Sequence, residues 1–301
     1  MGRLSVVGFP SSAGSYAAGQ DLAPAALREA GLIEALARVG LDVHDEGDLA
    51  AQVWRPDHEH PLAQNSADVL AGLQQLAARL HPLFDRGDTV LVLGGNCTIA
   101  LAMMAALDTA GPAVGLAYID RHYDLNTPST TTDGALDWMG MAHGLDLPGA
   151  IPHFAGAFGR RPLLVPSQVA WLGVDPALAT DWERLHATSL QLHVATSESL
   201  AADPAAAASA ALRALPSGPL AVHVDVDVLD FTDAPLAENT DGRNTGPTLA
   251  QVAIALDTIT ADPRMRALSI GELNPTRGAG DPTALPRFVD VVAHALSTNV
   301  A

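Results

Sequence analysis

Residues 113–124 read AVGLAYIDRHYD, and this stretch predicts a buried strand that ends at a cation site. The apolar run 113–119 is typical of a strand covered on both faces. On an extended backbone alternate side chains point to the same side, so Asp120, His122 and Asp124 are expected to converge just past the strand. Two carboxylates and an imidazole aimed at one point indicate a bound cation.

A second stretch repeats this pattern later in the chain. Residues 220–227 read LAVHVDVD, an apolar run followed by Asp225 and Asp227. Gathering four carboxylates and one imidazole at two strand ends is costly unless a metal offsets their repulsion. Such an oxygen-rich set suits Mn²⁺ better than a structural Zn²⁺. Four carboxylates are also enough for two ions that share bridging ligands.

The rest of the chain alternates between strand and helix patterns. Strands are predicted over 4–9, 41–44, 89–93, 113–119, 168–174, 220–224 and 267–272, and helices over 24–39, 66–84, 99–107, 138–145, 204–215, 248–259 and 285–296. We expect Ser66 to cap its helix, residues 45–48 to form a turn, and the His-Glu-His tract 58–60 to lie in a solvated loop. The alternation predicts an α/β fold, a mainly parallel sheet with helices on both faces, as a single domain over 1–301.

Polar motifs follow four of the predicted strands. They are Cys97 after the Gly94-Gly95 turn, the motifs that begin at Asp120 and Asp225, and Glu272. Binding sites in parallel sheets lie beyond the carboxyl ends of the strands. We therefore expect all four motifs to contribute to one active site.

Composition limits the partners of the chain. Of its 301 residues 48% are hydrophobic, and 16 basic against 34 acidic side chains give a net charge of −18. This balance argues against nucleic acid or an anionic membrane as the main partner and favours metal ions and cationic small molecules. The single cysteine excludes an internal disulfide framework. Residues 1–7 lack a long apolar core and no apolar run reaches transmembrane length, so we expect a cytoplasmic protein.

Taken together, the motifs resemble those of the ureohydrolase family, which includes arginases and agmatinases. Residues 120–124 match the family's Asp-Ala-His-x-Asp motif, residues 225–230 (DVDVLD) its second metal motif, and residues 272–275 (ELNP) its Glu-x-Asn-Pro signature. Residues 19–28 (GQDLAPAALR), 45–49 (DEGDL) and 125–128 (LNTP) resemble further family segments. The resemblance covers nearly the whole chain.

The resemblance implies a three-layer α/β/α fold, two Mn²⁺ ions and a homo-oligomer, either a trimer or a hexamer. A metal-bridging hydroxide would attack the guanidino carbon of a cationic linear substrate, and Glu272 would pair with the guanidinium through two parallel hydrogen bonds. The implied metal ligands are Asp120, His122, Asp124, Asp225 and Asp227. The implied substrate-binding positions are Asn126, Thr131, Asp133, Glu238 and Asn239.

Four features depart from the family pattern. The segment 94–98 (GGNCT) stands where the family has Gly-Gly-Asp-His-Ser, so Cys97 is expected to replace a ligand His as a thiolate, which a helix N-terminus favours. The alternative is an inert buried thiol. Asp133 replaces a Ser that in arginases helps to hold the amino acid's carboxylate, and residues 237–240 (AENT) differ from the family's Thr-Gly-Thr-type segment.

Asp137 stands where the family has a catalytic His. With an ordinary pKa of about 4, an Asp would be a poorer proton carrier at neutral pH. We count Asp137 as a candidate catalytic residue, and the alternatives are that it binds a cationic group or caps the helix that follows.

Charge counting favours an activated substrate. Four carboxylates, a neutral imidazole and two Mn²⁺ ions sum to zero, and a Cys97 thiolate leaves one net negative charge. The metals would then be weaker Lewis acids, which suits a substrate that is easier to attack, such as an N-hydroxyguanidine. The Cys-for-His change also resembles a branch of the family that hydrolyses Nω-hydroxy-L-arginine to hydroxyurea and ornithine.

Two other interpretations stay open. A non-catalytic ureohydrolase relative that binds a ligand or a partner fits the lost His, but such a site has no need to hold repelling acids together. A single-Zn deacylase of related architecture would leave Asp124 and Asp227 without a role. The number of metal ions per chain distinguishes this deacylase from a binuclear enzyme.

Overall fold

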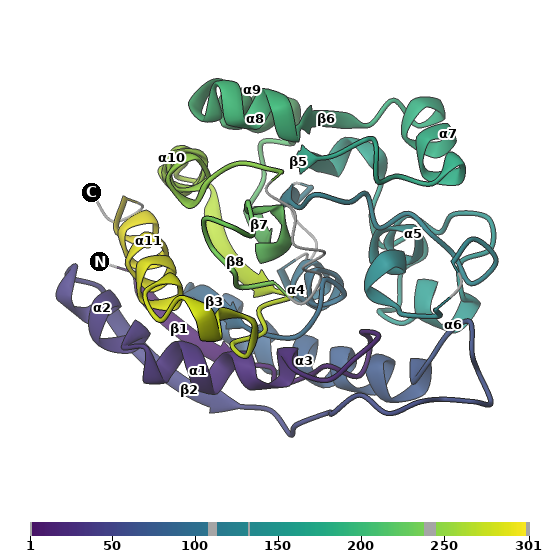
Figure 1. The fold of residues 1–301 in the computed structure, drawn as a ribbon, viewed down its shortest axis with the longest axis horizontal. Coiled ribbons are helices and arrows are strands. Elements are labelled where there is room, and N and C mark those ends of the chain that lie inside the picture. Colours follow the sequence, from purple (N-terminus) through teal and green to yellow (C-terminus); the bar gives the residue numbers. More distant parts are fainter. Residues whose placement is uncertain (1, 108–112, 132, 238–244, 299–301) are drawn as a thin grey trace.

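One eight-stranded parallel sheet forms the centre of the molecule (Figure 1). The computed structural model describes residues 2–107, 113–131, 133–237 and 245–298. Within these residues the strand order is β2-β1-β3-β8-β7-β4-β5-β6. The strands are β1 (Arg3–Gly8), β2 (Asp42–Asp48), β3 (Thr89–Leu93), β4 (Gly115–Ile119), β5 (Val169–Val174), β6 (His193–Thr196), β7 (Leu220–Asp225) and β8 (Met265–Gly271).

Helices cover both faces of this sheet, which confirms the predicted α/β fold (Figure 1). The α-helices are α1 (Ala23–Glu29), α2 (Leu32–Arg38), α3 (Ser66–Asp85), α4 (Ile99–Leu107), α5 (Gly140–Gly144), α6 (Pro152–Ala155), α7 (Asp181–Ser189), α8 (Ser197–Ala202), α9 (Pro204–Ala214), α10 (Leu249–Thr260) and α11 (Ala284–Thr298). Short 3₁₀ helices are η1 (Gln20–Leu22), η2 (Asp137–Met139), η3 (Pro166–Gln168), η4 (Val226–Val228) and η5 (Arg277–Gly280).

Two apolar cores lie on opposite faces of the sheet. Strand β4 shows the division, because Ala117 and Ile119 belong to one core and Leu116 and Tyr118 to the other. The first core includes apolar side chains of α1, α2 and α8 to α11, and the second includes those of α3 to α6. Alternate residues of a strand face opposite sides, so a strand buried on both sides must be apolar throughout.

Several predicted element boundaries are wrong. The predicted turn 45–48 belongs to β2, which runs on to Asp48 at the sheet edge. The predicted helix 24–39 is two helices, because Gly31 takes a left-handed φ of 86° between them. Ser66 is the first residue of α3 rather than its cap, and Asn65 before it makes no capping side-chain bond. Helix α7, strand β6 and helix α8 were not predicted.

The sheet places four polar motifs at one edge. Strands β3, β8, β7 and β4 are consecutive neighbours, and all of them run in the same direction. Their carboxyl ends therefore lie side by side, where Cys97, Glu272, Asp225 and Asp120 follow or end the strands. The predicted co-location of these motifs is confirmed.

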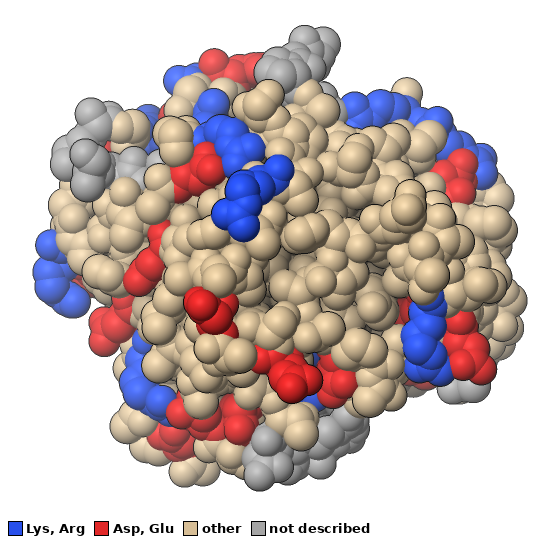
Figure 2. Space-filling model, turned by 90° about the horizontal axis from the view of Figure 1, so that it is seen from above, with Lys and Arg blue, Asp and Glu red and all other residues tan. Residues whose placement is uncertain are grey.

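On the face shown in Figure 2, the charged side chains are spread rather than gathered. Figure 2 shows acidic and basic groups mixed around one face, with mainly uncharged atoms between them. Many lie in ion pairs, such as the pair in which Arg28 Nε lies 2.7 Å from Asp45 Oδ2. Across the described residues, no helix has both the length and the apolar character needed to cross a bilayer.

Candidate metal centre

Two overlapping groups of possible metal ligands lie at the carboxyl edge of the sheet. Cys97, Asp120 and Asp225 form the first group, and Asp120, His122 and Asp124 form the second. Within each group the donor atoms lie within 4.8 Å of one another. Asp120 belongs to both groups, as expected of a carboxylate that bridges two ions.

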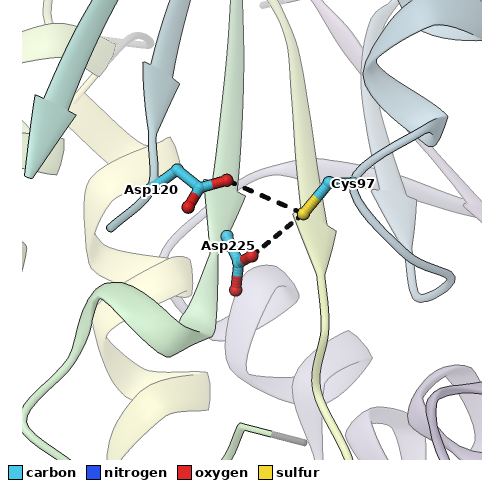
Figure 3. Close-up of side chains that lie close together, drawn as sticks. All are labelled: Cys97, Asp120 and Asp225. Carbon is cyan, nitrogen blue, oxygen red and sulfur yellow. Dashed lines mark hydrogen bonds between the residues drawn. The ribbon is translucent and has the colours of Figure 1, made fainter. Parts of the chain in front are cut away.

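Cys97 points its sulfur at two carboxylates of this centre. Cys97 Sγ lies 2.9 Å from Asp225 Oδ2 and 3.7 Å from Asp120 Oδ2 (Figure 3). The side chain is 3% exposed. Burial, with the neighbouring carboxylates Asp225, Asp124 and Asp120, raises the pKa of the Cys97 thiol well above its usual range. The expectation that the helix N-terminus favours a thiolate is therefore not met by the protein groups alone.

The loop after β4 converges by a tight turn rather than by strand alternation. The strand ends at Ile119, before any of the ligand-type residues. Asp120 Oδ1 accepts a hydrogen bond of 2.6 Å from the backbone N–H of His122. Asp124 takes a left-handed φ of 54°, which turns its carboxylate back towards Asp120. The predicted convergence is confirmed, but the extended geometry behind the prediction is wrong.

Asp225 and Asp227 are joined in a similar way. Asp225 Oδ1 accepts a 2.7 Å hydrogen bond from the backbone N–H of Asp227, the middle residue of η4. Asp227 Oδ2 lies 3.1 Å from His122 Nδ1, while its Oδ1 is buried without a partner in the described residues. Although burial raises it, the pKa of Asp227 is held below its usual range by His122 and the Arg121 guanidinium.

The electrostatics of the donor set fit a cation site. Burial, followed by repulsion from other carboxylates, raises the pKa of Asp124 and Asp225 well above the usual range. The pKa of Asp120 is raised for the same first reason. Mutually repelling buried acids are stabilised by divalent cations, and the unpartnered Asp227 oxygen offers one more ligand atom. Oxygen-rich donors with one imidazole and one sulfur fit two such ions.

Glu272 is anchored beside the same carboxylates. Its Oε1 accepts a hydrogen bond from the backbone N–H of Cys97 at 3.2 Å, and its Oε2 accepts one from Gln20 Nε2 at 2.9 Å. Burial, and then the charge of Asp137, raises its pKa well above the usual range. Each carboxylate oxygen keeps a further lone pair, so the group can still accept from a bound cation.

Asp137 faces the same small pocket as Glu272. A cavity of about 20 Å³ is lined by both of these side chains and by Cys97, Asp225 and Asp227, among others. Burial raises the pKa of Asp137 to about 8, so the assumption of an ordinary pKa is wrong. The alternative that Asp137 caps the helix is wrong, because Asp137 is the first residue of η2 and Leu136 holds the cap position, although Asp137 Oδ1 accepts the Trp138 N–H at 2.9 Å.

A second, larger cavity lies next to the first. It measures about 340 Å³, and three predicted substrate-binding residues line it, Asn126, Thr131 and Asp133. Trp138 lines both cavities. The other two predicted positions, Glu238 and Asn239, lie outside the described residues.

Three side chains of the centre were not predicted from the sequence. Gln20 holds Glu272, the Tyr118 hydroxyl donates to Asp124 Oδ2, and Trp138 packs edge-on against His122 with ring centres 4.7 Å apart. The family-like segment 19–28 was a signal for Gln20 that was not assigned a role. The tract 58–60 is exposed and outside the two ligand groups of the described residues, and His60 pairs with Asp57, which supports its assignment to a solvated loop.

Known proteins resemble this chain in sequence. The arginase family model matches residues 3–296. Human arginase-1 is 32% identical over 177 residues, which cover 58% of this chain and 55% of that protein. The chain thus spans about half the length of the curated relatives it matches.

Solved structures share the fold. An arginase from Bacillus caldovelox superposes with a TM-score of 0.86 at 24% identity, over 99% of this chain and 98% of that one. A proclavaminate amidino hydrolase from Streptomyces clavuligerus superposes with a TM-score of 0.72 at 19% identity, over 99% of this chain and 93% of that one. These likenesses show the fold alone.

Proposed function

Because the chain belongs to the arginase family, we propose that it is a metal-dependent amidinohydrolase that cleaves a guanidino C–N bond. The substrate is a small linear guanidino compound, and the products are an amine with urea or a hydroxyurea. We propose Nω-hydroxyarginine as a better substrate than arginine or agmatine. The observation that carries this proposal is the pair of ligand groups that share Asp120 and include Cys97.

The proposed cofactor is a pair of Mn²⁺ ions. Cys97, Asp120, His122, Asp124, Asp225 and Asp227 would hold them. Bound there, the ions would supply Lewis acidity and lower the pKa of a water molecule. Cys97 is the residue that sets this site apart, because a thiolate adds a negative charge that a neutral imidazole does not.

The remaining site residues bind the substrate and move protons. Glu272 is positioned by Gln20 and the Cys97 backbone, so its carboxylate is fixed before a guanidinium arrives. Asp137, with a pKa of about 8 in its buried position, holds a proton at neutral pH that it can give to a leaving amine. We propose that Asn126, Thr131 and Asp133 contact the substrate's tail from the larger cavity.

The preference for a hydroxylated guanidine follows from the charge of the site. A Cys97 thiolate would leave the metal ions less positive and the water less acidic than a His ligand would. A guanidine whose leaving group or carbon is more reactive depends less on that activation. The lower charge of the metal ions thus favours Nω-hydroxyarginine as substrate and predicts weak activity on arginine.

The test is amine formation by the Mn²⁺-loaded protein from Nω-hydroxyarginine, arginine and agmatine, measured side by side with metal content. We expect Nω-hydroxyarginine to be hydrolysed fastest and two ions to be bound per chain. Equal rates on arginine would contradict the proposed preference. No turnover of any guanidine would contradict the enzymatic function and favour the ligand-binding relative, and a single bound ion would favour the mononuclear alternative.

We also propose that the protein is a cytoplasmic homo-oligomer, a trimer or a hexamer, of one-domain chains. Family resemblance supports this assembly. Light scattering coupled to size-exclusion chromatography measures the mass of the assembly, and the mass of a single chain would contradict the proposal.

A further inference from the structure

Trp138 belongs to the lining of both cavities of the site. The inner cavity of about 20 Å³ holds the metal-type ligands, and Trp138 is part of its lining. Trp138 also lines the outer cavity of about 340 Å³, together with hydroxyl and amide groups such as Thr131 and Asn126. A water molecule occupies roughly 10–15 Å³ by this measure, so the inner cavity admits only a small group. A linear substrate that occupied both cavities would contact Trp138 in each of them.

The backbone and ring of Trp138 are held in place from several sides. Its N–H donates to Asp137 Oδ1 at 2.9 Å, and its carbonyl accepts the backbone N–H of Asn126 at 3.0 Å. The ring lies edge-on to His122, with the two ring planes inclined at 72°. A side chain fixed in this way can discriminate between ligands, because little reorganisation is needed on binding.

The indole N–H of Trp138 has no acceptor among the residues that the structure describes. Its Nε1 is buried, and no described residue accepts a hydrogen bond from it. A buried donor without a partner costs free energy that a ligand acceptor can recover. By contrast, Trp182 Nε1 donates to the carbonyl oxygen of Leu125 at 2.9 Å. The unpaired group therefore belongs to a side chain that lines both cavities.

We propose that Trp138 is a specificity-determining residue whose indole wall admits linear guanidines and whose N–H donates a hydrogen bond to an oxygen of the substrate. The inference rests on the proposed function and identifies which substrates that site prefers. The acceptor is either the hydroxyl of an N-hydroxyguanidine or a carboxylate on the tail. Sites built to hydrogen-bond a substrate group discriminate strongly against analogues that lack it.

Two variants distinguish the steric role of the indole ring from the hydrogen-bond role of its N–H. Trp138→Phe keeps an aromatic wall and removes the N–H, and Trp138→Ala removes both. The matched control is Trp54→Phe, because Trp54 Nε1 is also buried without a described partner but Trp54 lines neither cavity. Each protein is loaded with Mn²⁺, its metal content is measured, and kcat and KM are determined for Nω-hydroxyarginine, arginine and agmatine.

We expect Trp138→Phe to lose about tenfold in kcat/KM on substrates that carry the acceptor, the effect of one hydrogen bond. Agmatine has neither oxygen, so its rate should change little. A loss on Nω-hydroxyarginine alone assigns the hydroxyl, and an equal loss on arginine assigns the carboxylate. Trp138→Ala should in addition reduce the differences in kcat/KM among the three substrates. An equal effect on all three, agmatine included, or no effect at all, would overturn the proposal.

Measurements of ligand binding test this inference independently of the proposed function. If the unaltered protein hydrolyses none of the three compounds, the proposed function fails. Calorimetry then compares their dissociation constants for the unaltered protein, Trp138→Phe and Trp54→Phe. Weaker binding of the oxygen-bearing compounds to Trp138→Phe alone supports the inference, and identical constants, or no binding of any compound, overturn it.

Discussion

Tyr118 connects a core strand to a predicted metal ligand. Its ring is buried in β4 and stacks on His223 with centres 4.9 Å apart, and its hydroxyl donates to Asp124 Oδ2. Such a bond leaves the other oxygen of Asp124 as the ligand atom and fixes the carboxylate's orientation. Groups of this kind raise metal affinity by holding ligands in place.

We predict that Tyr118→Phe weakens Mn²⁺ binding by roughly 10- to 100-fold, because Asp124 loses its hydrogen bond. Competition with a chelator of known affinity measures the change. Tyr123→Phe is the control, since no hydrogen bond from the Tyr123 hydroxyl to a predicted ligand is found among the described residues. Unchanged Mn²⁺ affinity in Tyr118→Phe would show that Asp124 does not depend on this contact.

Residue type and spacing were enough to predict most of the centre. The cluster of possible ligands was predicted because Asp120, His122 and Asp124 follow one apolar run and Asp225 and Asp227 follow another. Tyr118 and Gln20 were not found, since their roles depend on contacts made only after folding; Gln20 meets Glu272 across 252 positions of sequence. The raised pKa of Asp137 also depends on burial, which the local sequence does not reveal.

At the level of elements, α5 carries a histidine that must stay neutral. His143 is 1% exposed, and its Nδ1 lies 2.6 Å from the carbonyl oxygen of Met139, to which it donates. Burial lowers the pKa of His143 to about 4. In the unfolded chain the same group takes up a proton near its ordinary value of about 6.5. Between these two values the unfolded state binds more protons than the folded state. Folding stability therefore decreases as the pH is lowered from about 6.5 towards 4.

We predict that His143 contributes full stability above about pH 6.5 and loses up to about 3 kcal/mol as the pH falls towards 4. His143→Asn should remove this part of the pH dependence while keeping a donor for Met139. Urea unfolding between pH 7 and about pH 4 measures it. His58→Asn, in the exposed loop, is the control. Parallel stability curves for the unaltered protein and His143→Asn would contradict the prediction.

Elements with strong local patterns were predicted, and elements set by their neighbours were not. Strand β3 and helix α4 match the predicted bounds, because their apolar runs are framed by glycines and loops. Strand β2 was cut short since its polar sequence, DVHDEGD, pairs only with β1 at the sheet edge. Helix α7 has a Thr180–Glu183 capping box that signals its start, but its low apolar content hid it.

For the whole molecule, we expect metal binding and folding to depend on each other. Carboxylates or a thiol end or follow four neighbouring strands, and burial raises the pKa of most of these groups. Divalent ions that bind only the folded chain shift unfolding by mass action, by about 2.7 kcal/mol at a hundredfold excess over the dissociation constant.

We therefore predict that saturating Mn²⁺ raises the melting temperature of metal-free protein by about 5 °C or more, and that chelation reverses the shift. Scanning calorimetry measures both. The double variant Asp120→Asn, Asp225→Asn should be more stable without metal and should lose the Mn²⁺ response, because repulsion and ligands disappear together. A melting temperature that is the same with and without Mn²⁺ would contradict a metal centre in this position.

The central claim is that Cys97 tunes a binuclear site towards a hydroxylated guanidine. The most direct test compares the rates on Nω-hydroxyarginine and arginine for the unaltered protein and for Cys97→His, both loaded with Mn²⁺. We predict that the ratio of the two rates falls by at least about tenfold in Cys97→His, since a neutral ligand restores Lewis acidity and favours arginine. An unchanged ratio would contradict the claim.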